Sequence, residues 1–399
     1  MSAVPDAASA RRALAGLVDD GLGDDDVRRI YATAVWSTLV EPGDGVAGAL
    51  IRALGAVDAL ETALSTASAG AAATAAGIDH DDVHAARRRW QLRQDAVEGA
   101  LSAARRARVT LLTPRDSSWP HRLDDLGVHA PLCLWVRGEL AVADAEGAVA
   151  VVGARAATAY GVHVVSGLSA DCASDGITVV SGAAYGIDAA AHRAALRAGG
   201  ATVAVLAGGV DRPYPAGHED LISQIAVRGA VVAEVPCGSA PTKWRFLARN
   251  RLIAAMTDAT VVVEAAHRSG ALNTAHHAAA LGRPLGAVPG PVTSAASAGC
   301  HRLLREADAV CVTGVADVLE LLGRGGDATL EVDADRTDDR TRVLDALSSR
   351  SPRLLADIAR RCGMAPEEVA ALLGLLELDG AVERREGGWA RRASSAPRH

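Results

Sequence analysis

From about residue 132 to residue 322, short runs of β-branched apolar residues alternate with longer stretches of mixed polarity. The short runs are apolar on both faces, as expected for parallel strands that helices cover on both sides. The stretches between them, such as 187–198 and 271–282, are long enough for crossover helices. The predicted strands span residues 149–153, 177–181, 202–207, 230–235, 260–264, 284–288 and 309–313. This pattern predicts an α/β domain built on a doubly wound parallel sheet.

The N-terminal region has a different pattern. Residues 1 to about 108 are rich in alanine and lack strand-like runs of valine and isoleucine. Leu50, Leu54 and Leu60 recur at near-helical spacing, which indicates amphipathic helices. We therefore predict a small helical domain over 1–108, of the SAM or helix-hairpin-helix kind. The α/β domain follows it over 109–323, after a connector that contains prolines.

The C-terminal region begins with a linker. Residues 324–340 are polar, acidic and glycine-containing, which is typical of a spacer between domains. After it, residues 341–394 show two helical patterns joined by a Gly363-Met364 turn, then a third helix and a hairpin. This order resembles a winged helix, and residues 395–399 form a short tail.

Composition limits the class of protein. The chain has 399 residues, of which 49% are hydrophobic and 22% charged, so it can bury a sizeable core. No apolar run approaches the roughly 20 residues of a membrane span, and no signal-peptide pattern opens the chain, so we expect a cytoplasmic protein without membrane insertion. The six cysteines form no C-x-x-C pair, which predicts buried hydrophobic residues instead of disulfides or a metal site.

One short segment concentrates residue types that are rare elsewhere. Lys243 and Phe246 are the only lysine and the only phenylalanine of the chain. The same segment, 242–251, also contains Trp244, Arg245, Arg249 and Arg251. Cations interleaved with rings suit a single nucleic-acid strand, because cations meet phosphates and rings stack on bases. The alternative is an arginine-bearing helix whose phenylalanine packs in the core, and the spacing alone does not separate the two. The net charge of −7 argues only against nucleic-acid binding over the whole surface.

The ends of the predicted strands carry further candidate residues. In a doubly wound sheet, ligands bind beyond the carboxyl ends of the strands, near helix N-termini. Glycines there allow the backbone to approach an anion closely, and hydroxyl and amide side chains add donors. The candidates after the first, second and fifth strands are Gly153, Arg155, Thr158, Ser181, Gly182, Ser269, Gly270, Asn273 and Thr274.

The same strand ends argue against several kinds of enzyme. The first lacks the G-x-G-x-x-G fingerprint, which speaks against a nicotinamide cofactor, and no Walker A motif indicates an ATP-driven motor. Asp188 and His192 share a helix face, but no third ligand or nucleophile accompanies them. A helix cap and local packing are therefore favoured over an acid–base or metal site. Glu264 stays open between a catalytic acid and a partner for an arginine of 245–251.

The motifs, taken in chain order, resemble those of the DNA-processing protein A family, also called DprA or Smf. They cover roughly residues 115–315. The matching residues are Gly153-Ala154-Arg155, Thr158, Tyr160-Gly161, Ser181-Gly182, Gly186-Ile187-Asp188, His192, Tyr214-Pro215, Phe246, Arg249-Asn250-Arg251, Val263-Glu264-Ala265, Ser269-Gly270, Leu272, Thr274-Ala275 and Val288-Pro289-Gly290. One such motif is weak, but the ordered series is specific.

The resemblance implies a function and a set of site residues. It implies an extended Rossmann-like fold and a non-enzymatic protein, without cofactor or metal, that binds and protects single-stranded DNA irrespective of sequence. It also implies a homodimer that loads the RecA recombinase during natural transformation or recombination. With the strand-end candidates above, the predicted DNA-binding residues are completed by Lys243, Arg245, Phe246, Arg249, Asn250 and Arg251.

The chain departs from the family pattern at a few positions. Ala154 and Ala271 each replace a hydroxyl residue, Tyr185 replaces a common arginine, and Leu247 stands where proline is usual. These changes predict weaker phosphate contacts, or contacts redistributed toward Lys243 and Arg245. Two alternatives to a strand binder stay open. One is a Rossmann-like hydrolase of nucleoside monophosphates, and the other is an interaction scaffold that uses the winged helix.

Overall fold

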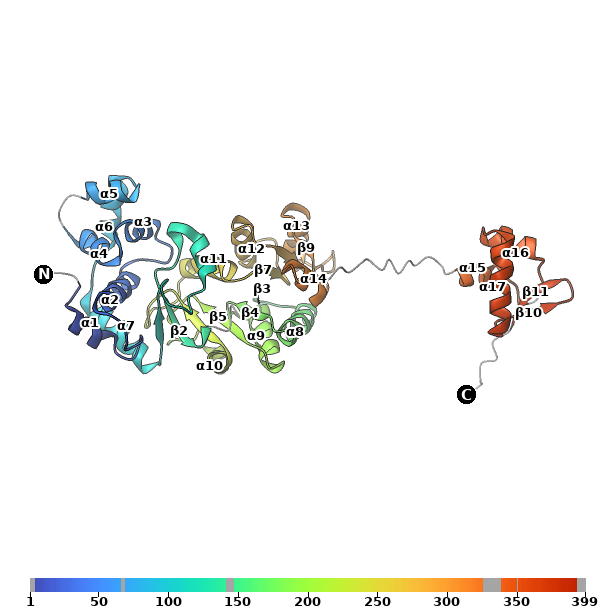
Figure 1. Cartoon of the computed structure of the whole chain (residues 1–399), viewed down its shortest axis with the longest axis horizontal. Coiled ribbons are helices and arrows are strands. Elements are labelled where there is room, and N and C mark those ends of the chain that lie inside the picture. Colours follow the sequence, from blue (N-terminus) through green and yellow to red (C-terminus); the bar gives the residue numbers. More distant parts are fainter. Residues whose placement is uncertain (1–3, 66–68, 141–146, 326–338, 350, 393–399) are drawn as a thin grey trace. The chain divides into compact units, whose positions relative to one another are not determined.

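The computed structural model describes residues 4–65, 69–140, 147–325, 339–349 and 351–392. It divides into two compact units, Met1–Gly325 and Gly326–His399 (Figure 1). Most of the predicted linker 324–340 and the whole predicted tail 395–399 lie outside the described residues. Those two predictions are therefore not tested.

The first unit is built on one sheet with the strand order β1-β2-β6-β5-β4-β3-β7-β8-β9. The strands are β1 (Thr110–Leu112), β2 (Leu134–Gly138), β3 (Ala148–Val152), β4 (Thr178–Ser181), β5 (Thr202–Leu206), β6 (Ala230–Ala233), β7 (Ala259–Val262), β8 (Leu285–Ala287) and β9 (Val310–Cys311). The strands from β3 to β9 pair in parallel, and the chain leaves β3 in one direction and later returns on its other side as β7. The predicted doubly wound parallel sheet is confirmed.

Two strands at one edge were not predicted. β2 pairs antiparallel with β6, and β1 pairs antiparallel with β2. β1 has only three residues, and β2 contains an indole, a cation and a glycine instead of a β-branched run. Their register comes from pairing with a remote strand, which a local pattern does not reveal.

Helices cover both faces of the sheet (Figure 1). They are α8 (Ala159–Ser174), α9 (Ile187–Arg197), α10 (Glu219–Arg228), α11 (Lys243–Ala255), α12 (Ala271–Ala280), α13 (Ala298–Glu306) and α14 (Val315–Leu321), with the 3₁₀ turns η1 (His121–His129) and η3 (Ala216–His218). Alternate side chains of β3 divide between two cores. Val149 and Val151 pack with α8 and α9, whereas Ala148 and Ala150 pack with α11, α12 and α13.

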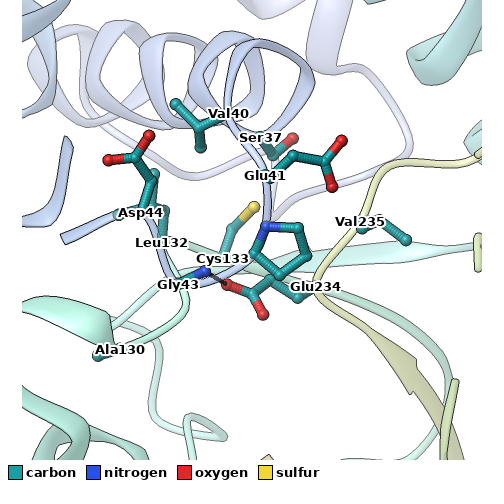
Figure 2. Close-up of a pocket in the computed structure, with 11 residues that line it drawn as sticks. Ser37, Val40, Glu41, Gly43, Asp44, Ala130, Leu132, Cys133, Glu234 and Val235 are labelled. Carbon is teal, nitrogen blue, oxygen red and sulfur yellow. Dashed lines mark hydrogen bonds between the residues drawn. The ribbon is translucent and has the colours of Figure 1, made fainter. Parts of the chain in front are cut away.

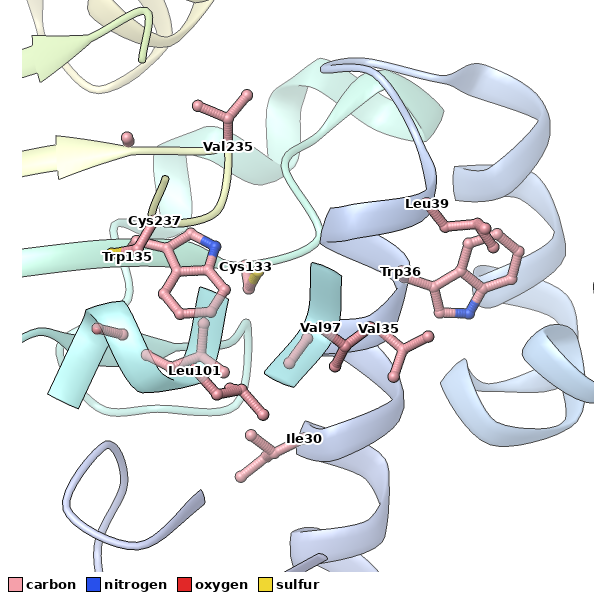
Figure 3. Packing of buried hydrophobic residues seen from close by; sticks show 14 of the residues in the cluster. Ile30, Val35, Trp36, Leu39, Val97, Leu101, Cys133, Trp135, Val235 and Cys237 are labelled. Carbon is pink, nitrogen blue, oxygen red and sulfur yellow. The ribbon is translucent and has the colours of Figure 1, made fainter. Parts of the chain in front are cut away.

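The N-terminal region is helical, as predicted. Its helices are α1 (Ala7–Leu14), α2 (Asp24–Leu39), α3 (Gly45–Leu54), α4 (Ala56–Leu64), α5 (Gly70–Ala76), α6 (His80–Arg89) and α7 (Gln94–Arg106). Trp36 packs edge-on against Trp90 with ring centroids 5.1 Å apart. The helices also share a hydrophobic core with the sheet, because Ile30 and Leu101 belong to one cluster with Trp135 (Figure 3). The regions 1–108 and 109–323 therefore form one compact unit.

The second unit has the elements of a winged helix, which confirms the prediction. They are α15 (Asp339–Ala346), α16 (Leu355–Cys362), α17 (Pro366–Leu378) and the antiparallel hairpin of β10 (Val382–Arg385) and β11 (Gly388–Arg391). Gly363 ends α16 with a φ of 65°, a left-handed conformation that glycine adopts without steric cost. Val343, Ile358 and Leu373 are buried in the core of this unit.

The cysteines and the helix lengths test two compositional predictions. All six cysteines are free and all but one are buried, so the prediction of buried residues is wrong only for the exposed Cys311. Among the described residues, no group of three or more His, Cys, Asp or Glu side chains is arranged to hold a metal ion. Within those same residues, no helix has the length and apolar character needed to cross a membrane.

Candidate nucleic-acid interface

A pocket lies at the point where the strand order reverses, between the ends of β3 and β7. Its volume is about 350 Å³, and the loops after β3, β4 and β7 line it together with α11. Ligands of doubly wound sheets bind at this kind of reversal. The predicted DNA-binding residues that line it are Gly153, Arg155, Phe246, Arg249, Asn250, Ser269, Gly270 and Thr274.

Close backbone approach shapes this pocket. Gly186 has a φ of 80°, and a Cβ atom there would lie 2.2 Å from the carbonyl oxygen of Ala154. The backbone amide of Ile187 donates to that same carbonyl at 3.2 Å. Only glycine fits between the two loops, since any side chain would displace one of them. The loops after β3 and β4 are thus held side by side.

The N-terminus of α12 lines the pocket, whereas the N-terminus of α11 lies outside the lining. Thr242 caps α11, where its hydroxyl accepts the backbone N–H of Arg245 at 3.2 Å. Ser269 stands at the start of α12, and its hydroxyl accepts the backbone N–H of Ala271 at 3.3 Å. Unpaired N–H groups and the helix dipole make such termini favourable for anions. The start of α12 thus directs backbone N–H groups toward the pocket.

Phe246 lies in the pocket wall. Its ring is half-buried and belongs to none of the hydrophobic clusters of the described residues. The guanidinium carbon of Arg155 lies 4.8 Å above the ring centroid, and the Tyr214 ring lies 5.6 Å away. A cation over an aromatic face is attracted by the ring quadrupole. The alternative of a core phenylalanine is not what the structure shows.

Exposed aromatic residues gather around the same rim. Tyr185 is 53% exposed and Tyr214 is 50% exposed. Most other large rings of the first unit are buried, including four tryptophans, so exposed rings are the minority in this unit. Tyr185 also contacts the ring of His218, with centroids 4.7 Å apart. Sequence reasoning did not include Tyr214 among the site residues. Its place in the turn after β5, at the same edge of the sheet as Phe246, is the signal that would have found it.

Arg249 is a buried cation at the base of the pocket. It is 6% exposed, and its Nη1 donates to the carbonyl oxygen of Val205 at 2.6 Å. Its Nε is buried without a hydrogen-bond partner among the described residues. Burial lowers the pKa of Arg249 to about 10, although the charge of Asp188 opposes the shift. The guanidinium therefore stays charged at neutral pH and attracts an anion from within the pocket.

Two predicted arginines are held by carboxylates instead of facing the pocket. Arg245 makes a two-pronged pair with Glu41, at 2.9 and 2.8 Å. Arg251 is 6% exposed and pairs with both oxygens of Glu234 at 2.7 Å. Figure 2 shows Glu41 and Glu234 beside the loop between α2 and α3, where Glu234 also accepts the backbone N–H of Gly43 at 3.2 Å. These pairs tie α11 to the N-terminal helices.

The remaining predicted residues support the pocket from outside its lining. Thr158 caps α8 and donates its hydroxyl to Glu264 at 2.6 Å. The buried hydroxyl of Ser181 donates to the carbonyl oxygen of Val151 at 2.6 Å. Asn273 accepts from the side-chain amide of Asn250 at 3.2 Å. Each of these groups fixes a loop or a neighbouring side chain.

Gly182 and Lys243 occupy two further positions outside the lining. A Cβ atom on Gly182 would lie 2.0 Å from Nη1 of Arg249, so this glycine makes room for the buried guanidinium. Lys243 is exposed on the first turn of α11. Its ammonium therefore stands in solvent, about one helical turn before Phe246 of the pocket lining.

Asp188 and His192 are both buried and do not share a ligand. His192 Nδ1 lies 2.7 Å from the hydroxyl of Thr202, and burial lowers the pKa of the imidazole to about 3. Burial raises the pKa of Asp188, and its carboxylate accepts the backbone N–H of Ala184 at 3.4 Å. The packing interpretation of this pair agrees with these contacts. His192 is fully buried and lies outside the pocket lining, so it does not act with Asp188 on a ligand there.

Comparison with known proteins identifies the family. The family model described as DNA recombination-mediator protein A matches residues 110–323, and the DprA winged helix domain model matches 328–388. The chain belongs to the DNA processing protein A family. A relative in Mycobacterium tuberculosis that carries the DprA name is 43% identical over 381 residues, which cover 90% of this chain and 93% of the relative. The Smf protein of Escherichia coli is 35% identical over 272 residues, which cover 65% of this chain and 72% of that protein.

A solved structure of the family supports the same assignment. DprA of Streptococcus pneumoniae superposes with a TM-score of 0.58 at 30% identity, over 73% of this chain and 96% of the other. The resemblance inferred from the ordered motifs is therefore confirmed, as is the fold with its winged helix. This chain is a DprA-family protein with a role in DNA processing.

Proposed function

We propose that this DprA-family protein binds single-stranded DNA without sequence preference through the pocket between β3 and β7. The observation that carries the proposal is the Arg155 guanidinium stacked 4.8 Å above the Phe246 ring, at the mouth of a pocket that the N-terminus of α12 lines. The ring offers a face to a base, while the cations and N–H groups offer contacts to phosphate.

The lining favours contacts that are common to all four bases. The half-buried ring of Phe246 in the lining and the exposed rings of Tyr185 and Tyr214 beside it suit stacking on any base, since every base has a π-face. The polar side chain best placed to recognise a base edge, Asn250, already donates to Gly270 and Asn273 at 3.4 and 3.2 Å. Sequence preference should therefore be weak.

A non-enzymatic role is favoured over hydrolysis of nucleoside monophosphates. The hydrolase alternative depends on Glu264 as an acid that protonates a leaving group. Glu264 is 1% exposed, and its two carboxylate oxygens accept the backbone N–H and the hydroxyl of Thr158 at 2.9 and 2.6 Å. A carboxylate held in this way caps a helix and does not reach a ligand.

Family membership supports three further parts of the proposal. The protein would act in the cytoplasm as a homodimer, protect incoming or exposed single strands, and load the RecA recombinase on them. RecA loading is tested by the rate of RecA ATP hydrolysis on single-stranded DNA, which should rise when the protein is added. Dimerisation is tested by light scattering of the full chain over a range of concentrations.

The decisive experiment is a fluorescence anisotropy titration of labelled dT20 and of its duplex at several salt concentrations. We expect binding of the single strand, with much weaker binding of the duplex. If Arg155, Lys243 and Arg249 neutralise phosphates, these three contacts should contribute about −2 to the slope of log K against log salt. Absence of binding at low salt would overturn the proposal, and release of free base from nucleoside monophosphates would revive the hydrolase.

A further inference from the structure

A second cavity lies between α9 and α10, away from the lining of the central pocket. Its volume is about 720 Å³, and the two helices pack against each other along it. Arg193, Arg197 and Arg228 line it, and all three side chains are exposed. We call this cavity the α9–α10 groove.

The three arginines of the α9–α10 groove have no carboxylate partner within the part of the chain that the structure describes. The groove contains one acidic residue, Asp220, so positive charge exceeds negative charge locally on a chain whose net charge is −7. Arg193 and Arg197 also stand four positions apart on one helix face, where like charges repel and destabilise the helix. An anion bound between them would remove that repulsion.

Neutral donors accompany the arginines. Ser223 and Gln224 line the same groove from α10, and both side chains are exposed. Hydroxyl and amide groups of this kind commonly contact the phosphate and sugar of a nucleic-acid backbone. The chemistry of the groove therefore suits a phosphodiester chain better than an apolar or a cationic ligand.

The α9–α10 groove and the central pocket share no lining residue, but Tyr185 lies between them. Ala184 and Asp188 line the central pocket, and Tyr185, which follows Ala184, approaches Gly217 of the groove lining. The Tyr185 hydroxyl lies 3.2 Å from the position that a Cβ atom on Gly217 would take. The exposed Tyr185 ring thus stands between the two cavities.

The dimensions fit a short run of nucleotides. Within α9, Asp188 lines the central pocket and Arg197, the last residue of the helix, lines the groove. At a rise of about 1.5 Å per residue, this stretch is about 14 Å long. Stacked nucleotides advance by about 3.4 Å each, so the groove would hold about four of them.

We propose that a single DNA strand leaves the central pocket past Tyr185 and continues along the α9–α10 groove, where Arg193, Arg197 and Arg228 bind its phosphates. This inference rests on the proposed function and names a second segment of the strand's path. The occupant is a phosphodiester backbone, which the charge of the groove and its position beyond Tyr185 from the pocket both favour.

The test compares the salt dependence of dT20 binding in the full-length protein and two triple variants. The groove variant is Arg193→Gln, Arg197→Gln and Arg228→Gln. The control variant, Arg12→Gln, Arg52→Gln and Arg88→Gln, removes the same charge from exposed arginines of the N-terminal helices. With pocket and groove both engaged, the wild-type slope should be about −4, and the groove variant should return it to about −2. The control variant should keep the wild-type slope.

Each outcome has a separate meaning. If the wild type does not bind dT20, the proposed function itself is contradicted. If dT20 binding has the same salt slope in the wild type and the groove variant, the groove proposal alone is overturned. The three arginines would then suit an acidic protein partner instead. Equal flattening in both triple variants would also overturn it, because a general field effect would explain the result.

Single substitutions keep the proposal testable if the groove variant folds poorly. Arg193→Gln and Arg228→Gln should each flatten the slope by about 0.7, since each removes one phosphate contact. Circular dichroism of each variant checks that the fold is retained. Unchanged slopes in both folded single variants would reject the path through the groove.

Discussion

The cations and rings of segment 242–251 and of the β3 loop fall into two sets that differ in what they contact. The outer residues, Arg155, Lys243 and Phe246, face the pocket or solvent. The inner arginines, Arg245 and Arg251, are held by Glu41 and Glu234. Arg249 lies at the base of the pocket and donates to the carbonyl oxygen of Val205. Residues of one chemical type on one helix thus have two roles.

The difference shows that a basic motif does not give the number of phosphate contacts. Arg245 and Arg251 have carboxylate partners that already balance their charge, so a phosphate would have to displace Glu41 or Glu234. The outer residues have no carboxylate partner that a phosphate would have to displace. The inner arginines instead fix α11 against the N-terminal helices and the sheet, which holds the outer residues in place.

The largest effect is expected when an inner arginine is removed. Arg251→Ala would leave Glu234 buried without its partner, which should lower the free energy of unfolding by about 3–5 kcal/mol. Urea unfolding followed by tryptophan fluorescence measures it, because Trp36, Trp119 and Trp135 are buried in this unit. The control Arg268→Ala removes an exposed arginine and should change stability by less than about 0.5 kcal/mol. A small loss in Arg251→Ala would place this residue with the outer set.

The second prediction concerns the effect of pH on stability through the buried imidazole of His192. The folded-state pKa of His192 is lowered to about 3, so the unfolded chain binds a proton first as pH falls below about 6.5. The free energy of unfolding is therefore at its full value above about pH 6.5 and falls below it. The loss is about 2 kcal/mol at pH 5. Asp188, whose pKa burial raises, acts in the opposite sense at lower pH.

Urea unfolding at pH 7 and pH 5 measures this loss. His192→Gln removes the titrating group, and its stability should differ less between the two pH values. An equal pH dependence in the wild type and in His192→Gln would show that the imidazole is not the group responsible.

The third prediction separates two neighbouring rings. Phe246→Ala should weaken dT20 binding by about 1–3 kcal/mol without changing the salt slope, because stacking is lost while phosphate contacts remain. Trp244→Ala is the matched control. The Trp244 ring is 61% exposed and lines a different cavity with His129, so its loss should leave the affinity nearly unchanged. Unfolding of Phe246→Ala at room temperature would instead show that the ring stabilises the fold.

The smallest effect is expected from a direct comparison of one outer and one inner arginine. Arg155→Gln should flatten the salt slope of dT20 binding by about 0.7, since it removes one free cation. Arg245→Gln should leave the slope nearly unchanged, because Glu41 already neutralises this side chain at 2.8 Å. Glu41→Gln is the complementary variant, and it should steepen the slope if the released Arg245 reaches the strand. Equal slopes in Arg155→Gln and Arg245→Gln would remove the distinction between the two sets.

Much of the fold and part of the site could be predicted from the sequence. The β-branched runs gave the parallel strands because buried strands need apolar side chains on both faces. The strand-end rule led to the loops that line the pocket, including those of Gly153 and Ser269. The edge strands β1 and β2 were missed, because their pairing depends on remote partners.

The sequence alone determined which residue types are available at the rim: the single lysine, the single phenylalanine and a dense set of arginines within ten positions. Helical periodicity and strand patterns follow from local chemistry, so they could be predicted. Only the tertiary structure decided which arginines are free. Glu41 lies 204 positions from Arg245, and the carbonyl oxygen of Val205 lies 44 positions from Arg249. Charge pairing acts through space, and the distances that govern it exist only after the chain has folded.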